Sequence, residues 1–246
     1  MGGRPGPGPA ATSRAATIGA PVVRTSGARR RRGKGTVVAV SETGQAARSA
    51  KRELRRGLLA AREALGADEL REAERALARQ ALALPELAQA RTVAAYVSVG
   101  AEPGTLALLD ALRARGVRVL LPALLPDNDL DWGVYAGRDS LARVRHGGRM
   151  ALLEPAGPHL GPQAVTEADV VLLPGVAVDT RGMRLGRGGG SYDRVLARLE
   201  TAGVRPALVV LLYDGEVVAR VPDQPHDRPV QAVVTPSGVR RFTGQG

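Results

Sequence analysis

The chain has 246 residues, of which 44% are hydrophobic, and its 35 Lys and Arg against 24 Asp and Glu give a formal net charge of +11. It contains no cysteine, which excludes disulfide bonds, thiolate metal sites and a cysteine nucleophile and is typical of a reducing compartment. No apolar run approaches the roughly 18 residues that a membrane-spanning helix needs. We therefore expect a cytoplasmic protein that does not bind membranes.

The basic excess is concentrated at the N-terminus. Residues 1–47 hold eight basic residues and a single acid, Glu42, in a segment rich in Gly, Pro and Ala. Such a segment cannot bury an apolar core, so we predict a disordered basic tail over residues 1–47. Because only 2% of all residues are aromatic, surfaces that stack bases are poorly supplied and we expect no specific nucleic-acid partner. Binding of nucleic acid through tail charge stays open as an alternative.

Two helices are predicted after the tail. Residues 46–66 carry leucines at helical spacing opposite a strongly basic face. Asp68 can cap a second amphipathic helix, which Pro85 ends. These helices precede the first apolar strand.

Strands and helices alternate beyond residue 92. Short apolar runs over residues 93–99 and 117–122 enclose a helical segment over 105–116, and such strand–helix–strand units indicate a parallel sheet. Residues 130–136 alternate like an edge strand, whereas 139–167 read as mostly irregular. The remaining predicted elements are strands over 168–175, 206–213 and 230–236 and a helix over 189–203.

The predicted fold is therefore of the α/β class. We expect a single domain over residues 48–241, with a mainly parallel central sheet flanked by helices. The N-terminal helices belong to this domain, and the disordered tail precedes it.

A glycine-rich stretch between the strand at 168–175 and the next helix is the strongest candidate site. Gly186, Gly188, Gly189 and Gly190 allow the backbone to curl so that several N–H groups point at one anion, beside a helix N-terminus. The forked donors of two arginines and a carboxylate in the first helical turn accompany them, namely Arg184, Arg187 and Asp193. The loop matches neither the P-loop nor the dinucleotide fingerprint, so phosphate binding and a structural turn both remain open.

Two further acidic positions follow predicted strands. Asp227 lies in the loop PDQPHDRPV, where strand ends of a parallel sheet converge, and a carboxylate there suits Mg²⁺ together with phosphate oxygens. His226 beside it is an alternative metal ligand or an ordinary surface residue. Glu102 comes just after the first strand and is either a ligand contact or an acid at a helix start.

Taken together, the motifs resemble the 5-formyltetrahydrofolate cyclo-ligase family, also called 5,10-methenyltetrahydrofolate synthetase. The resemblance extends over about residues 48–236, and its most specific segment is RLGRGGGSYD at 184–193. The other segments that carry it are KRELRR at 51–56, YVSVGAEPGT at 96–105, LDWGVY at 130–135 and PHDRPVQAVVT at 225–235.

The resemblance implies a reaction and its cofactors. Members of the family convert 5-formyltetrahydrofolate to 5,10-methenyltetrahydrofolate with ATP and Mg²⁺, releasing ADP and phosphate. The formyl oxygen attacks the γ-phosphate, and N10 then closes the ring as phosphate leaves. The protein contributes placement and charge neutralisation rather than a covalent residue. We expect a monomer whose partners are the folate and ATP.

The family's site residues carry over onto matching positions. Lys51 and Arg187 are the implied catalytic residues. The implied ATP contacts are Lys51, Arg52, Glu53, Leu54, Arg55, Arg184, Leu185, Gly186, Arg187, Gly188, Gly189, Gly190, Ser191 and Tyr192. The implied folate contacts are Val97, Glu102, Arg187, Gly188, Gly189, Gly190 and Ser191, and the implied magnesium carboxylates are Asp193 and Asp227.

One position departs from the family pattern, and other functions stay open. Ser191 stands where the family often has a second tyrosine before Tyr192, which puts the affinity for a ligand packed on that ring in doubt. The alternatives are an ATP-binding paralogue that acts on another ligand and an enzyme similar to sugar-phosphate isomerases or acyl-CoA transferases, which share related architectures.

Overall fold

A computed structural model describes residues 35–147, 150–223 and 227–242 of the chain. Its centre is a seven-stranded sheet in the order β12-β11-β9-β6-β1-β2-β3. The strands in this order are β12 (Gly238–Arg241), β11 (Ala232–Thr235), β9 (Ala207–Leu211), β6 (Val170–Pro174), β1 (Thr92–Ala94), β2 (Arg118–Leu124) and β3 (Leu130–Val134). The five inner strands are parallel, and only the edge strands β12 and β3 pair antiparallel with their neighbours. The prediction of a mainly parallel α/β sheet is confirmed.

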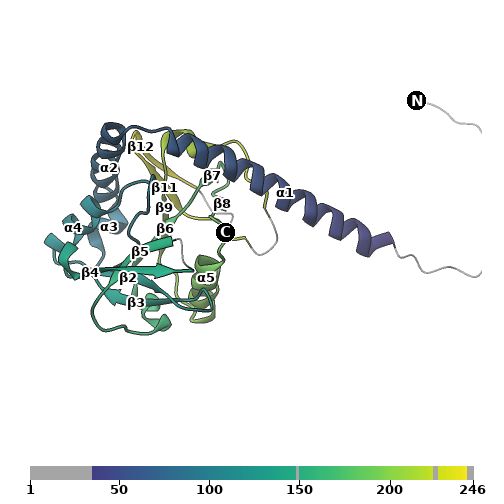
Figure 1. Cartoon of the computed structure of the whole chain (residues 1–246). Helices are drawn as coiled ribbons and strands as arrows, with labels where there is room; N and C mark the ends of the chain where they lie inside the picture. Colours follow the sequence, from purple (N-terminus) through teal and green to yellow (C-terminus); the bar gives the residue numbers. More distant parts are fainter. Residues whose placement is uncertain (1–34, 148–149, 224–226, 243–246) are drawn as a thin grey trace, which may run out of the picture.

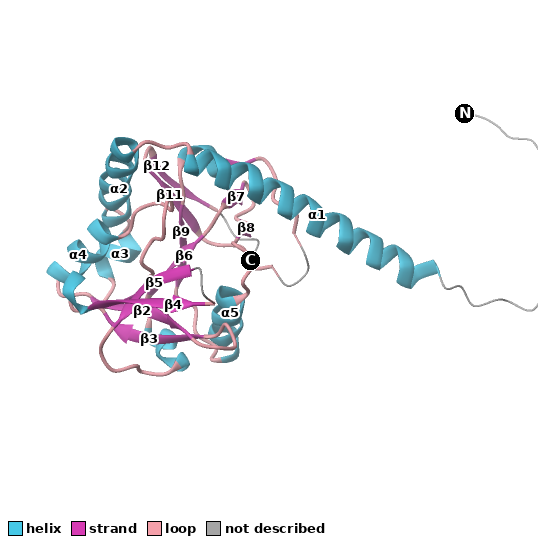
Figure 2. Ribbon diagram, viewed as in Figure 1, coloured by secondary structure: helices cyan, strands magenta, loops and turns pink. Residues whose placement is uncertain are grey.

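Helices cover both faces of this sheet (Figure 2). Successive strand residues point to opposite faces, so Val93 and Val119 pack into one apolar cluster while Ala94 and Leu120 pack into the other. The first cluster is covered by α2 (Ala67–Leu82), α3 (Pro85–Gln89) and α4 (Leu106–Ala114); the second is covered by α5 (Ser191–Thr201) and the 3-10 helix η2 (Pro162–Glu167). A fully buried leucine such as Leu109 contributes about 1.5–3 kcal/mol to this core.

The first helix, α1 (Gly35–Glu63), begins earlier than the sequence predicts. Figure 1 shows α1 crossing one end of the domain and projecting beyond it. Residues 35–45 contain no proline, so a helix nucleated by the leucine-bearing part can extend through them. Residues 35–47, which the sequence places in the tail, thus belong to the described helix, and residues 1–34 lie outside the described part.

The docked part of α1 is held by an apolar contact and lies over a small second sheet. Leu54, Leu58 and Leu59 pack against a cluster that includes Val176 and Leu185. The small sheet has the order β10-β7-β8, with β10 (Val217–Val218), β7 (Ala177–Asp179) and β8 (Arg184–Leu185). A basic helix is thus fixed beside the glycine-rich stretch that follows β8.

The segment 139–167, predicted to be mostly irregular, contains a hairpin. Its strands are β4 (Leu141–His146) and β5 (Met150–Pro155), flanked by the 3-10 helix η1 (Arg138–Ser140). Arginines at 143 and 145 alternate with less polar residues on β4, and these charges concealed the two-residue period in the sequence. The hairpin contributes one wall of the cavity described below.

Several boundaries also differ from the predictions. Gly66, not Asp68, is the N-cap residue of α2, and the Glu69 carboxylate accepts the Gly66 N–H at 2.7 Å. Strand β1 ends at Ala94 rather than at residue 99 because the chain leaves the sheet there. The residues that follow β1 line the cavity instead of continuing the ladder. Among the described residues, no helix combines the length and the apolar character needed to cross a bilayer.

Candidate active site

A cavity of about 650 Å³ opens at the carboxyl ends of the parallel strands β1, β2 and β6. This edge of an open α/β sheet is where ligands generally bind. The cavity brings together most of the residues predicted from the sequence, namely Lys51, Arg52, Arg55, Val97, Glu102, Arg184, Leu185, Gly186, Arg187, Gly188, Gly189, Gly190, Ser191, Tyr192, Asp193 and Asp227.

The glycine-rich loop forms the floor of the site and leads directly into α5. Gly188 and Gly190 have φ values of +97° and +78°, a region that disfavours residues with a side chain. Gly190 is the N-cap of α5, and no side chain caps the helix. The first turn of α5, with its N–H groups and positive dipole end, therefore borders the cavity and suits an anion.

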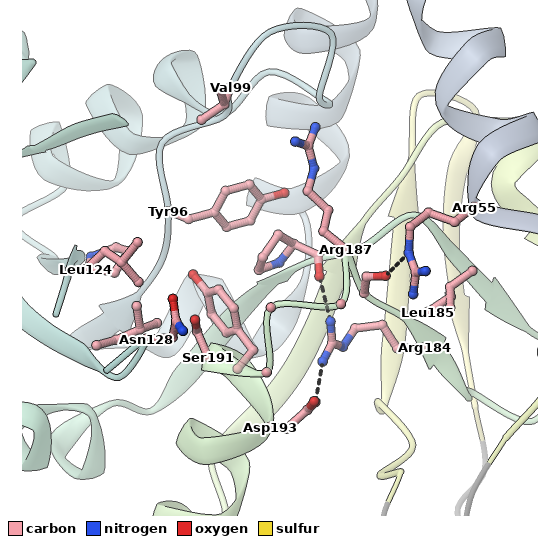
Figure 3. Close-up of a pocket in the computed structure, with 18 of the residues that line it drawn as sticks. Arg55, Tyr96, Val99, Leu124, Asn128, Arg184, Leu185, Arg187, Ser191 and Asp193 are labelled. Carbon is pink, nitrogen blue, oxygen red and sulfur yellow. Dashed lines mark hydrogen bonds and ion pairs between the residues drawn. The ribbon is translucent and has the colours of Figure 1, made fainter. Parts of the chain in front are cut away.

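Two arginines of this loop have different surroundings. The Arg184 side chain is only 7% exposed, donates to the Pro174 carbonyl at 2.9 Å and lies 3.4 Å from an Asp193 oxygen. Its Nε has no hydrogen-bond partner among the described residues, and burial lowers the pKa of its guanidinium. Arg187 is 44% exposed, and its Nε lies 2.8 Å from a Glu102 carboxylate oxygen. In Figure 3, Arg187 extends away from Arg184 toward the segment that carries Tyr96 and Val99.

Helix α1 supplies further cations beside the glycine-rich loop. The Lys51 ammonium lies 2.5 Å from an Asp227 carboxylate oxygen, and both groups are mostly buried. The Arg55 Nε donates to the Gly186 carbonyl at 2.9 Å, a contact visible in Figure 3. Partial burial lowers the pKa of Arg55. These contacts join α1 to the glycine-rich loop.

Two predicted ATP contacts do not line the cavity. The Glu53 side chain is 78% exposed and pairs with Arg56, while Leu54 packs into the apolar cluster beneath α1. A helix presents only one face to a ligand, so a continuous run of five residues cannot all reach it. Lys51, Arg52 and Arg55 share the face that does, and Arg48 and Gln45, the latter from the predicted tail, extend it.

Glu102 is held at the other end of the cavity. Its Oε2 accepts the Val99 N–H at 2.8 Å, and its Oε1 faces Arg187. Tyr96 and Tyr192 lie in the same wall, and burial raises the pKa of both hydroxyls. The Tyr192 hydroxyl is buried without a hydrogen-bond partner among the described residues. Both rings are therefore neutral, and both can contact a ligand.

The two predicted magnesium carboxylates line the same cavity. Asp193 lies in the first turn of α5 near Arg184, and Asp227 is paired with Lys51. The described residues contain no cluster of three or more His, Asp or Glu that could hold a metal. Two carboxylates with phosphate oxygens and water are nevertheless a donor set that Mg²⁺ uses. His226 lies outside the described residues.

Sequence reasoning missed several lining residues, most of them on the apolar side of the cavity. Tyr96 is next to Val97, a predicted folate contact, and could have been included on that ground. Asn128 has a positive φ of 64°, a turn conformation that asparagine favours. The hairpin residues of the lining belong to no motif that would identify them as site residues. The missed lining residues are Gln45, Arg48, Tyr96, Val99, Pro122, Leu124, Asn128, Leu130, Leu152, Leu153, Glu154 and Pro174. The cavity thus has a cationic side and an apolar side.

Comparison with known proteins assigns the family of this chain. The sequence profile of the 5-formyltetrahydrofolate cyclo-ligase family matches residues 47–236, well over half of the chain. The chain belongs to the 5-formyltetrahydrofolate cyclo-ligase family. It is therefore an enzyme of the cyclo-ligase class, and the resemblance derived from its motifs is confirmed.

Individual relatives agree with this assignment. The 5-formyltetrahydrofolate cyclo-ligase of Mycolicibacterium smegmatis is 42% identical over 59% of this chain and 74% of its own length. The Escherichia coli K12 enzyme of the same name is 33% identical over 72% of this chain and 96% of its own. The NMR structure of the Aquifex aeolicus 5,10-methenyltetrahydrofolate synthetase has a TM-score of 0.65 and 29% identity, covering 80% of this chain and 95% of that one.

Proposed function

We propose that this cyclo-ligase converts 5-formyltetrahydrofolate to 5,10-methenyltetrahydrofolate, with ATP and Mg²⁺, and releases ADP and phosphate. The observation that carries the proposal is that one cavity brings the cations of α1 and the glycine-rich loop together with Glu102 and an apolar wall. A triphosphate suits the cationic side, and a flat heterocycle with an aromatic substituent suits the apolar side.

The proposed reaction needs two bond-forming steps. The formyl oxygen attacks the γ-phosphorus of ATP, the bond to the ADP oxygen breaks, and an iminium phosphate forms. The N10 nitrogen then attacks the formyl carbon, its proton is lost, and the carbon–oxygen bond breaks to release phosphate. Activation by phosphate is required because a formamide oxygen is a poor leaving group.

The chain's own residues supply position and charge for these steps. Lys51, Arg184 and Arg187 with the α5 N-terminus place cationic groups and N–H donors where phosphate charge develops. Asp193 and Asp227 would hold Mg²⁺, which offsets phosphate charge when bound. Glu102 orients the folate, and Tyr96 and Tyr192 exclude water from that end of the cavity.

The test is formation of the methenyl product, followed by its absorbance, from 5-formyltetrahydrofolate and Mg²⁺ with and without ATP. We expect product only when ATP and Mg²⁺ are both present, with one ADP formed for each product molecule. An Arg56→Ala variant, altered on the exposed side of α1, should match the wild type. Folded protein that binds ATP but forms no product would contradict the proposal and favour a paralogue with another ligand.

A further inference from the structure

Behind the cavity, three residues form a brace, by which we mean Arg62, Tyr213 and Glu216. Arg62 is in the last turn of α1 and is 2% exposed. Its Nε and Nη2 donate to the two Glu216 carboxylate oxygens at 2.5 and 2.8 Å, and Nη2 also donates to the Gly175 carbonyl at 2.8 Å. The Arg62 guanidinium lies 5.7 Å from the centre of the Tyr213 ring.

The same carboxylate organises the chain after β9. Glu216 ends the 3-10 helix η3 (Asp214–Glu216), and it also accepts the Tyr213 N–H at 2.9 Å. Burial lowers the pKa of Arg62, but the hydrogen bond and charge of Glu216 outweigh this effect and leave it raised. The brace therefore fixes α1, the end of β6 and the end of β9 to one another through a charged pair.

One hydrogen bond links the brace to the site. The Tyr213 hydroxyl donates to the carbonyl of Ala101 at 3.2 Å, one residue before Glu102. None of the three brace residues lines the cavity, whereas Glu102 does. The Glu102 charge also acts on both Arg62 and Tyr213. The brace therefore reaches the ligand region through the segment that carries Glu102.

A buried ion pair carries a free-energy cost when it is used to hold two elements together. Apolar residues of similar volume generally give equal or greater stability, because they carry no desolvation penalty. The Arg62–Glu216 pair instead fixes the relative orientation of the elements, because a planar guanidinium holds both carboxylate oxygens and a carbonyl in one geometry. The Tyr213 ring lies against that guanidinium, and its hydroxyl holds the Ala101 carbonyl in place.

We propose that Arg62, Tyr213 and Glu216 are positioning residues that hold Glu102 at the folate end of the cavity. The inference rests on the proposed function, in which Glu102 orients the folate. It assigns the Tyr213–Ala101 link an effect on folate affinity that exceeds any effect on ATP affinity, because Arg55 and Arg184 keep their own hydrogen bonds to the Gly186 and Pro174 carbonyls.

The first experiment is Tyr213→Phe, which keeps the ring over Arg62 and removes only the hydroxyl that holds Ala101. We expect KM for 5-formyltetrahydrofolate to rise about three- to tenfold, as loss of one neutral hydrogen bond implies. The value of kcat and KM for ATP should stay within about twofold. Tyr135→Phe is the matched control, because that hydroxyl bonds Asp110 away from the cavity and its loss should leave both KM values unchanged.

A second experiment removes the charged pair and keeps the packing volume. The double variant Arg62→Met with Glu216→Leu should remain folded and show the same selective rise in KM for the folate. The single variant Arg62→Lys should also have a raised KM for the folate, because an ammonium cannot reproduce the forked geometry of a guanidinium.

The outcomes separate the brace from the proposed function. Wild-type turnover with unchanged folate KM in both the Tyr213→Phe and the double variant would overturn the positioning role. An equal rise in KM for ATP would also overturn it, since that result indicates general loosening of the site. Wild-type protein that neither turns over nor binds 5-formyltetrahydrofolate would overturn the proposed function and the brace with it.

Discussion

The region behind the cavity and the region within it each contain a buried arginine, and the two are treated in opposite ways. Arg62 has both oxygens of Glu216 and a carbonyl as partners, although its Nη1 has no hydrogen-bond partner among the described residues, and its pKa is raised. Arg184 has one good hydrogen bond and a distant carboxylate, and burial lowers its pKa. A buried cation whose charge is paired with a carboxylate of the protein has a structural role. A buried cation left under-satisfied beside a cavity is suited to an incoming anion.

The largest effect on stability should come from removing one partner of the Arg62–Glu216 pair. Glu216→Leu leaves Arg62 buried without its carboxylate, so we expect a loss of about 3–5 kcal/mol in the free energy of unfolding. Urea denaturation measures this change. Adding Arg62→Met should recover most of the loss, and a single variant as stable as the wild type would show that Arg62 does not depend on its partner.

A change in the cavity should affect rate rather than stability. Arg187 faces developing phosphate charge in the proposed reaction and is partly exposed, so Arg187→Ala should lower kcat about 10²-fold with little change in the denaturation midpoint. Steady-state kinetics with Arg56→Ala as the control checks this prediction. An unchanged kcat would show that Arg187 does not stabilise the reacting phosphate.

Arg184 itself provides the sharpest contrast with Arg62. Its replacement by Met removes a poorly paired buried charge, so we expect unchanged or increased stability. The dissociation constant for MgATP should nevertheless rise about 10- to 100-fold, the scale of a lost hydrogen bond to a charged group. Calorimetric titration and urea denaturation of the same preparation test both parts. A variant that is less stable than the wild type and binds MgATP normally would show that Arg184 has a structural role and not a ligand-binding one.

The smallest effect is expected for an exposed pair. Arg241 lies beside Glu86 on the surface, and its hydrogen bond lowers the pKa of that carboxyl. Arg241→Ala should lower the free energy of unfolding only slightly at neutral pH, because solvent and salt screen an exposed pair. Because the folded pKa of Glu86 is depressed, the contribution is present above the unfolded pKa and is lost as the pH falls through the folded pKa. Denaturation at several pH values should show the difference between variant and wild type shrinking under acid.

The sequence was sufficient where function depends on local spacing. The glycine-rich loop, its arginines and Asp193 lie within ten consecutive residues, so their placement together could be predicted from the chain alone. The brace was not predictable, because Arg62 and Glu216 are 154 positions apart and neither stands in a recognisable motif. The hairpin at β4 and β5 was missed because its charged residues conceal the strand pattern.

The placement of α1 has a consequence for how the enzyme acquires its activity. Lys51 meets Asp227 across 176 positions, and Arg55 meets Gly186 across 131. Contacts between such distant segments form slowly, since a long loop must close before they contribute. We therefore expect the sheet and its covering helices to assemble first and α1 to dock late. During refolding, recovery of turnover should lag behind recovery of secondary structure.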